Sequence, residues 1–263
     1  MSDPIVLSGT DCAAAIQPTY NAIGQLVRII STSTDPASMS YIRQKVRALT
    51  SYDFHVTVEY CPNLVALDDA VTKSNDRNTP TIIQRPFGFP EAARVTLYPW
   101  LDIDGLTLGS PFTPCTPKGI ITLLNYYNIP LKGKKVTIIG RSPLVGLPLS
   151  QLMIKESATV TVCHSKTENI EECTRAADII VSATGVPHLV NLDMISSGAV
   201  LVDVGYSKMP DGTIAGDIDP ACYPYSSAYT PVPGGVGPMT VYSLCQNAID
   251  FYKKGAYNAP LEI

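Results

Sequence analysis

Short apolar runs rich in β-branched residues recur through the second half of the chain. They cover residues 134–139, 158–163, 178–184 and 199–204. Such near-continuous apolar runs are typical of strands buried on both faces of a parallel sheet. The intervening segments 147–155 and 169–177 have the length and pattern of crossover helices. The pattern therefore predicts βαβ units and a doubly wound, Rossmann-like α/β domain.

The first half of the chain is less regular but also has α/β character. Its predicted elements are strands over 26–30, 55–59 and 81–84 and helices over 38–48 and 66–74. The segment 111–117 holds three prolines in seven residues, which excludes a continuing helix or a central strand. We therefore place a domain boundary there, with a helix beginning at Lys118.

These patterns predict two α/β domains with a cleft between them. The first covers residues 1–117 and is completed by a C-terminal helix over 241–263, where a helical pattern resumes after Pro238. The second covers residues 118–240 and has the doubly wound sheet. A chain of 263 residues, 45% of them hydrophobic, has enough apolar material for two modest cores.

Charge and cysteine content restrict the class of protein further. A net charge of −4 gives no basic field for nucleic acid or an anionic membrane. The seven cysteines are scattered without a CxxC pair, so we expect neither a disulfide framework nor a metal site. We see no signal peptide and no apolar stretch near the ~20 residues that span a bilayer. We therefore expect a cytoplasmic protein.

A glycine-containing turn follows the first strand of the second domain. The segment 140–146 begins and ends with glycine and opens a helix, where free backbone N–H groups and the helix dipole favour a pyrophosphate. Gly140, Arg141 and Ser142 are the candidate contacts. Ser142 replaces the middle glycine of the usual GxGxxG pattern, so a plain strand-to-helix turn remains an alternative.

The residues after the next strands indicate which dinucleotide binds. An NAD site would place a carboxylate after residues 158–163, but Ser165 and Lys166 stand there instead. Arg141 and Ser165 are suited to hold a 2′-phosphate, which favours NADP, although solvated surface charge is an alternative for any one basic residue. Further strand ends supply small residues at candidate cofactor positions, which are Thr184, Gly185 and Gly205.

Tyr41 and Lys45 are candidate catalytic residues in the first domain. Asp35 or Ser38 can cap the helix that contains them, and the i, i+4 spacing places both side chains on one helical face. An ordinary surface pair is the alternative, because spacing alone does not distinguish the two.

The segment 230–240 combines three prolines with three glycines, which indicates a rigid loop that permits close backbone approach to a flat ligand. Together with Tyr41, Lys45 and the segments 114–118, 140–142 and 163–167, it resembles the methylenetetrahydrofolate dehydrogenase/methenyltetrahydrofolate cyclohydrolase family. The resemblance extends from about residue 26 to residue 255. It implies a bifunctional enzyme that uses NADP and a tetrahydrofolate derivative, forms homodimers and supplies purine biosynthesis.

The resemblance also implies roles for individual residues. Lys45 matches the lysine of the cyclohydrolase step, Gln84 the glutamine that bonds it, Tyr41 a tyrosine packed on the folate rings, and Asp104 the aspartate that anchors the pterin. The loop over 230–240 matches a wall that contacts folate and cofactor. Its candidate contacts are Pro233, Gly234 and Gly237 for the substrate and Thr240 for the cofactor.

Two departures from the family's pattern affect the first domain. Arg85 begins a segment where the family has a mostly apolar Leu-Pro-Leu-Pro run, and Leu101 stands where a lysine usually precedes Asp102. Two alternatives to a bifunctional enzyme therefore stay open. They are a dehydrogenase with weak or no cyclohydrolase activity, and a catalytically idle NADP-binding protein.

Overall fold

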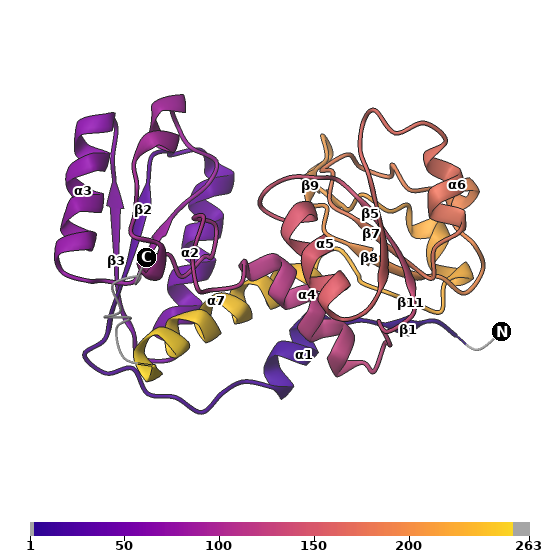
Figure 1. Ribbon diagram of the computed structural model, residues 1–263, viewed down its shortest axis with the longest axis horizontal. Coiled ribbons are helices and arrows are strands. Elements are labelled where there is room, and N and C mark those ends of the chain that lie inside the picture. Colours follow the sequence, from indigo (N-terminus) through magenta and orange to yellow (C-terminus); the bar gives the residue numbers. More distant parts are fainter. Residues whose placement is uncertain (1–2, 255–263) are drawn as a thin grey trace. The chain divides into compact units, whose positions relative to one another are not determined.

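The chain forms two compact units, each with its own parallel sheet (Figure 1). The computed structural model describes residues 3–254. The six-stranded unit comprises the described part of Met1–Gln17 together with Thr116–Thr240. The three-stranded unit comprises Pro18–Cys115 and the described part of Val241–Ile263. The division between the units falls within two helices, α4 (Cys115–Tyr126) and α7 (Val236–Lys253).

The six-stranded unit has a fully parallel sheet in the order β1-β11-β8-β7-β5-β6. Its strands are β1 (Ile5–Val6), β5 (Lys135–Ile139), β6 (Thr159–Cys163), β7 (Ile179–Ser182), β8 (Val200–Asp203) and β11 (Ala228–Tyr229). Every residue of β7 and β8 is buried, as expected for a sheet covered on both faces. The parallel sheet predicted from the sequence is confirmed.

Strand order fixes where a ligand binds in such a sheet. The chain runs from β5 outward to β6 through α5 (Gly146–Lys155), and then back past β5 to β7 through α6 (Ile170–Arg175). Right-handed crossovers in opposite directions place α5 and α6 on opposite faces. The direction changes between β5 and β7, and ligands of open α/β sheets bind at the carboxyl ends of the strands at this switch point.

Smaller elements complete the six-stranded unit. They are α1 (Gly9–Ala15), the antiparallel pair β9 (Ser207–Lys208) and β10 (Ile214–Ala215), and the 3₁₀ helices η3 (Leu192–Met194) and η4 (Pro220–Tyr225).

The three-stranded unit has parallel strands in the order β3-β2-β4. Its elements are β2 (Leu26–Ser31), α2 (Pro36–Thr50), β3 (His55–Tyr60), α3 (Leu64–Asp76), β4 (Thr81–Ile83), η1 (Pro90–Arg94) and η2 (Pro99–Leu101). The predicted strands and helices of this part are confirmed in type and position. Its core also contains Leu244, Ala248 and Phe251 from α7, so the chain returns to this unit at its C-terminal end.

The structure corrects three boundaries. Residues 1–17 were assigned to the first domain, but β1 pairs with β11 and covers what would otherwise be an edge of the six-stranded sheet. The helix expected at Lys118 begins at Cys115, and the C-terminal helix expected from residue 241 begins at Val236. Both helices have a proline in their first turn, where its missing N–H would be unpaired anyway. Residues 255–263 of the expected C-terminal helix lie outside the described residues.

Asn247 on α7 fixes the loop that follows η2. Its side chain is 1% exposed, and Nδ2 donates to the carbonyl oxygens of Ile103 at 2.9 Å and Thr113 at 3.1 Å. We predict that Asn247→Ala lowers the free energy of unfolding by about 2–3 kcal/mol, because two carbonyls lose a donor. Urea denaturation measures this. Gln246→Ala, which removes a half-buried bond to Asp250, is the matched control, and equal losses would contradict the prediction.

Candidate active site

Helix α2 presents the predicted Tyr41 and Lys45. Asp35 caps it, since its Oδ1 accepts from the N–H of Ser38 at 3.0 Å, which decides between the two expected caps. Tyr41 is 42% exposed, whereas Lys45 is 8% exposed. The helix therefore holds the amine in the protein interior and leaves the aromatic ring accessible.

Lys45 forms a buried ion pair with Asp104. The distance from Nζ to Oδ2 is 3.2 Å, and the two side chains are 10% and 13% exposed. The pairing offsets the cost of burying each charge, so removing one partner leaves an uncompensated charge in the interior. The structure thus brings together two of the four predicted catalytic residues from segments 59 positions apart.

Gln84 directly follows β4 but forms no hydrogen bond with Lys45, contrary to expectation. Its Nε2 donates to the carbonyl oxygen of Arg85 at 2.6 Å. Its buried Oε1 has no hydrogen-bond partner among the described residues. Lys45 Nζ donates to Asp104 instead, and a buried acceptor without a donor stands out in a folded protein.

Asp102 organises the loop that carries Asp104. Its carboxylate accepts from the backbone N–H groups of Asp104, Gly105, Leu106 and Thr107. Burial raises the pKa of Asp102, and the negative charge of Asp104 raises it further, against the lowering effect of the bonds from Thr107 and Leu106. Sequence reasoning treated Asp102 only as a neighbour of Asp104. An Asp two residues before Asp-Gly, typical of a side-chain-stabilised turn, was the available signal.

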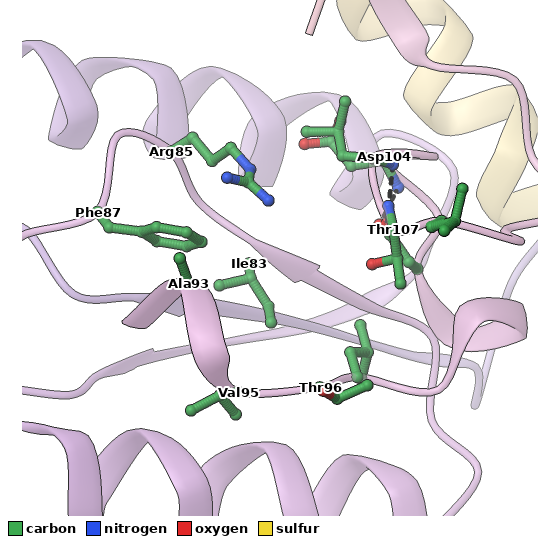
Figure 2. A pocket seen from close by; sticks show the side chains of 12 residues that line it. Ile83, Arg85, Phe87, Ala93, Val95, Thr96, Asp104 and Thr107 are labelled. Atoms are coloured by element: carbon green, nitrogen blue, oxygen red, sulfur yellow. Dashed lines mark hydrogen bonds between the residues drawn. The ribbon is translucent and has the colours of Figure 1, made fainter. Parts of the chain in front are cut away.

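A pocket of about 240 Å³ opens beside this loop (Figure 2). Arg85 and Phe87 lie on one side of it, and Asp104 and Thr107 lie on the other. Much of the remaining lining is apolar, from Ile83, Ala93, Val95, Leu97, Leu106 and Leu108. The three-stranded unit therefore has a hollow with apolar side chains in its lining and opposite charges on its two sides.

In the six-stranded unit, the glycine turn is closely packed at the switch point. Gly140 follows β5 with φ +115°, and an added Cβ would lie 2.5 Å from the carbonyl oxygen of Ala183. At Gly146 an added Cβ would lie 2.0 Å from the carbonyl oxygen of Gly140. Ser142 accepts the N–H of Val145 through Oγ at 3.2 Å. Both glycines are thus required by close backbone approach.

The other predicted cofactor residues lie on neighbouring strand ends. Arg141 and Ser165 are exposed and follow β5 and β6, which are paired in parallel. Thr184 and Gly185 follow β7. Thr240 instead bonds Thr116 within the unit, at 3.0 Å between the two hydroxyl oxygens.

The loop after β11 closes on the N-terminal segment. The carbonyl oxygen of Gly234 accepts from the N–H of Gly9 at 2.9 Å and from that of Thr10 at 3.2 Å, and Gly234 has φ +105°. Pro233 belongs to the same loop, whereas Gly237 lies in the first turn of α7, where an added Cβ would meet open space. The loop predicted over 230–240 is therefore shorter than expected: it ends where α7 begins at Val236, and it is anchored to the N-terminal segment through its backbone.

Two buried carboxylates that sequence reasoning missed hold the strand ends together. Oδ2 of Asp217 accepts from the hydroxyls of Ser182 and Thr184 and from the N–H groups of Thr184 and Gly185. Asp203 accepts from the N–H groups of Gly205, Asp217 and Ile218. Gly-Asp and Asp-x-Gly pairs at 216–217 and 203–205 were the available signal, because a side chain at Gly205 or Gly216 would collide with these carboxylates.

Within residues 3–254, no group of three or more His, Cys, Asp and Glu side chains is placed to hold a metal ion. No helix in this range is long and apolar enough to cross a membrane.

The switch-point turn and the buried Lys45–Asp104 pair define a class: two-unit α/β enzymes with one dinucleotide-binding unit. A family model for the tetrahydrofolate dehydrogenase/cyclohydrolase NAD(P)-binding domain matches residues 114–256. A bifunctional protein FolD from Aquifex aeolicus is 40% identical over 245 residues, which cover 86% of this chain and 84% of the relative. The bifunctional protein FolD from Polynucleobacter asymbioticus is 38% identical, and the match covers 93% of this chain and 92% of the relative.

Solved structures of this family are also similar to the chain in fold and sequence. The bifunctional FolD of Campylobacter jejuni is 31% identical with a TM-score of 0.87, covering 95% of this chain and 98% of its own. The Trypanosoma brucei N5,N10-methylenetetrahydrofolate dehydrogenase-cyclohydrolase, solved with NADP cofactor and inhibitor, is 30% identical with a TM-score of 0.86, covering 97% and 99%. The chain belongs to the tetrahydrofolate dehydrogenase/cyclohydrolase family, and the resemblance inferred from its motifs is confirmed.

The pKa of Asp203 tests whether this carboxyl is buried at the strand ends as the structure shows. Burial raises the pKa of Asp203 from 3.8 to about 6, despite three lowering backbone bonds. Between these values the folded state retains a proton that the unfolded chain has released, so this group's contribution to stability decreases as pH rises toward 6.

We predict that the Asp203 carboxyl carbon, followed by NMR, titrates near pH 6. Asp211 provides an internal control, because bonds from the Thr213 hydroxyl and N–H lower the pKa of that carboxyl. A midpoint for Asp203 at or below its ordinary value would contradict the prediction.

Proposed function

We propose that this chain catalyses NADP-dependent oxidation of 5,10-methylenetetrahydrofolate to 5,10-methenyltetrahydrofolate and hydrolysis of that product to 10-formyltetrahydrofolate. The observation that carries the proposal is the buried Lys45–Asp104 pair beside a pocket in the three-stranded unit. In a chain of this family, the pair supplies both an anchor for the pterin and a proton-exchanging amine.

The switch-point turns fit the pyrophosphate of a dinucleotide. Gly140 and Gly146 leave no room for a Cβ because backbone oxygens lie against them, so the turn is tightly folded before α5. The first N–H groups of a helix such as α5 favour a phosphate. Arg141 and Ser165 would hold the 2′-phosphate of NADP, and Thr184 and Gly185 would line the adjoining strand end. The nicotinamide, when bound, supplies the acceptor for a hydride.

The oxidation step places small demands on protein side chains. The reacting carbon of the substrate lies between two nitrogens, and the cation left by hydride loss is delocalised over both, so no base is required. The protein's contribution is to hold the substrate in aligned geometry. Tyr41, exposed on α2, offers its ring to the folate, and Asp104 offers a carboxylate to the N–H groups of the pterin.

The hydrolysis step requires proton transfer. Water loses a proton when it attacks the methenyl carbon, and a ring nitrogen gains one when the ring opens. Lys45 is the group assigned to this transfer. When a pterin engages Asp104, the ion pair loosens and the amine becomes available, while the unpaired Oε1 of Gln84 can accept one of its N–H bonds.

A dehydrogenase with weak cyclohydrolase activity is the second candidate. It is favoured by the present pairing of Lys45 with Asp104 instead of Gln84, and by the departures at Arg85 and Leu101. The two readings differ only in the fate of the methenyl product, so one assay separates them.

The family resemblance also underlies three finer proposals. The protein is cytoplasmic, it forms homodimers, and its 10-formyltetrahydrofolate supplies purine biosynthesis. The contacts of Pro233, Gly234, Gly237, Gly205 and Thr240 with substrate or cofactor belong to the same set of proposals.

Substitution of Lys45 tests whether this residue acts in the hydrolysis step and not in hydride transfer. We predict that Lys45→Met lowers cyclohydrolase turnover by about 10²–10⁴-fold, the usual contribution of a positioned acid or base, while hydride transfer keeps its order of magnitude. NADPH formation and methenyl-folate decay, followed together by absorbance, measure both steps.

Arg47→Met is the matched control, because Arg47 is an exposed cation on the same helix. It should leave both rates unchanged. Equal loss of the two activities in folded Lys45→Met protein would refute the roles assigned to the residue. Absence of NADPH formation by the unmodified protein would refute the proposed function itself.

A further inference from the structure

The guanidinium of Arg85 stacks on a ring but has no charged partner among the described residues, in a pocket where the other charges are paired or hydrogen-bonded. Its guanidinium carbon lies 4.4 Å from the centre of the Phe87 ring, and both residues line the pocket of about 240 Å³. Over residues 3–254 the guanidinium forms no hydrogen bond and no ion pair with another residue. Stacking holds the planar group in place but leaves its N–H donors unused.

The opposite side of the pocket presents an acceptor. Asp104 uses Oδ2 for Lys45, which leaves Oδ1 for a ligand. Asp102, which also lines the pocket, is saturated by four backbone N–H groups and offers little further capacity. Figure 2 shows Arg85 and Asp104 extending from different segments toward this space. A complementary ligand has donors at one position and an acceptor at another.

The size and charge of the pocket restrict the ligand. About 240 Å³ is smaller than the roughly 300–1,000 Å³ that encloses a drug-sized molecule, so the pocket takes one ring system of a larger substrate. An anionic carboxylate would attract Arg85 but meet the negative charge of Asp104. The pyrimidine edge of a 2-amino-4-oxo pterin satisfies both groups, because it carries two N–H donors beside a carbonyl oxygen.

We propose that Arg85 donates a hydrogen bond to the C4 carbonyl oxygen of the pterin while Asp104 accepts from its N3–H and 2-amino groups. This inference rests on the proposed folate activity and adds a specificity-determining residue to it. The departure from the family's apolar run at Arg85 thereby strengthens recognition of the oxo group. A 4-amino group presents N–H bonds toward the guanidinium, so the site disfavours 2,4-diamino pteridines.

The test compares folic acid with its 4-amino analogue, in which an amino group replaces the 4-oxo group and N3 carries no hydrogen. Because the contact with Asp104 also changes, the contribution of Arg85 is the change in the affinity ratio when Arg85 is substituted. Isothermal titration with NADP present gives both affinities. We expect the unmodified protein to favour the 4-oxo compound by about 10–100-fold, the range for one hydrogen bond to a charged group. In Arg85→Leu, the side chain expected from the family's pattern, the affinity ratio should fall by at least about tenfold.

Arg94→Leu provides the matched control, because Arg94 is exposed on η1 and does not line the pocket. Its affinity ratio should equal that of the unmodified protein. Thermal melting checks that both variants are folded, and Arg85→Lys, which keeps the charge without the planar fork, should discriminate less than arginine.

Two outcomes would overturn the proposal. An unchanged ratio in folded Arg85→Leu protein would show that Arg85 does not contact C4. Weaker binding of folic acid by this variant with unchanged binding of pteroic acid, which lacks the glutamate, would assign Arg85 to a carboxylate instead. Failure of the folate function is a separate result: the unmodified protein would bind neither compound and would form no NADPH.

Discussion

The buried ion pair between Lys45 and Asp104 is the interaction on which the proposed chemistry depends. An ammonium and a carboxylate in the interior stabilise each other only while both are present. A ligand that engages the carboxylate therefore changes the environment of the amine directly. The proposed mechanism thus couples substrate binding to proton transfer within one pair of side chains. In the proposed mechanism, the unpaired Oε1 of Gln84 would give the released amine a neutral acceptor.

A second constraint acts in the six-stranded unit, where the strand ends leave almost no space. Gly140 and Gly146 meet backbone oxygens, and Gly205 and Gly216 meet the carboxylates of Asp217 and Asp203. Asp217 bonds the turn after β7, and Asp203 bonds the segment containing Asp217. The buried carboxylates of Asp203 and Asp217 thus fix the turns that are proposed to hold the dinucleotide. Such fixed turns reduce the ordering cost of binding a ligand.

Much of the fold was predictable from the sequence, because apolar runs and helical spacing are local signals. The strands β2–β8 and the helices α2, α3, α5 and α6 follow from them. Helix starts were missed where a proline sits in the first turn, since proline was interpreted as a boundary. The pairing of β1 with β11 was missed because two-residue strands carry no periodicity and depend on a distant partner.

The sequence predicted which residues form the candidate site better than it predicted how they pair with one another. Lys45, Gln84 and Asp104 were identified from motifs, but the choice of Asp104 over Gln84 as the partner of Lys45 depends on how a loop lies against α2. That loop is set by Asp102 and Asn247, whose roles arise from contacts between segments far apart in sequence. The unused N–H donors of the Arg85 guanidinium likewise became apparent only when the residues around it in the structure were known.

The most direct test of the central claim is a crystal structure with a bound folate analogue and NADP. The account predicts an oxygen of Asp104 within about 2.7–3.2 Å of a pterin nitrogen, with Lys45 Nζ drawn toward the one-carbon bridge. A pterin bound away from Asp104, with the Lys45–Asp104 distance unchanged from 3.2 Å, would contradict it.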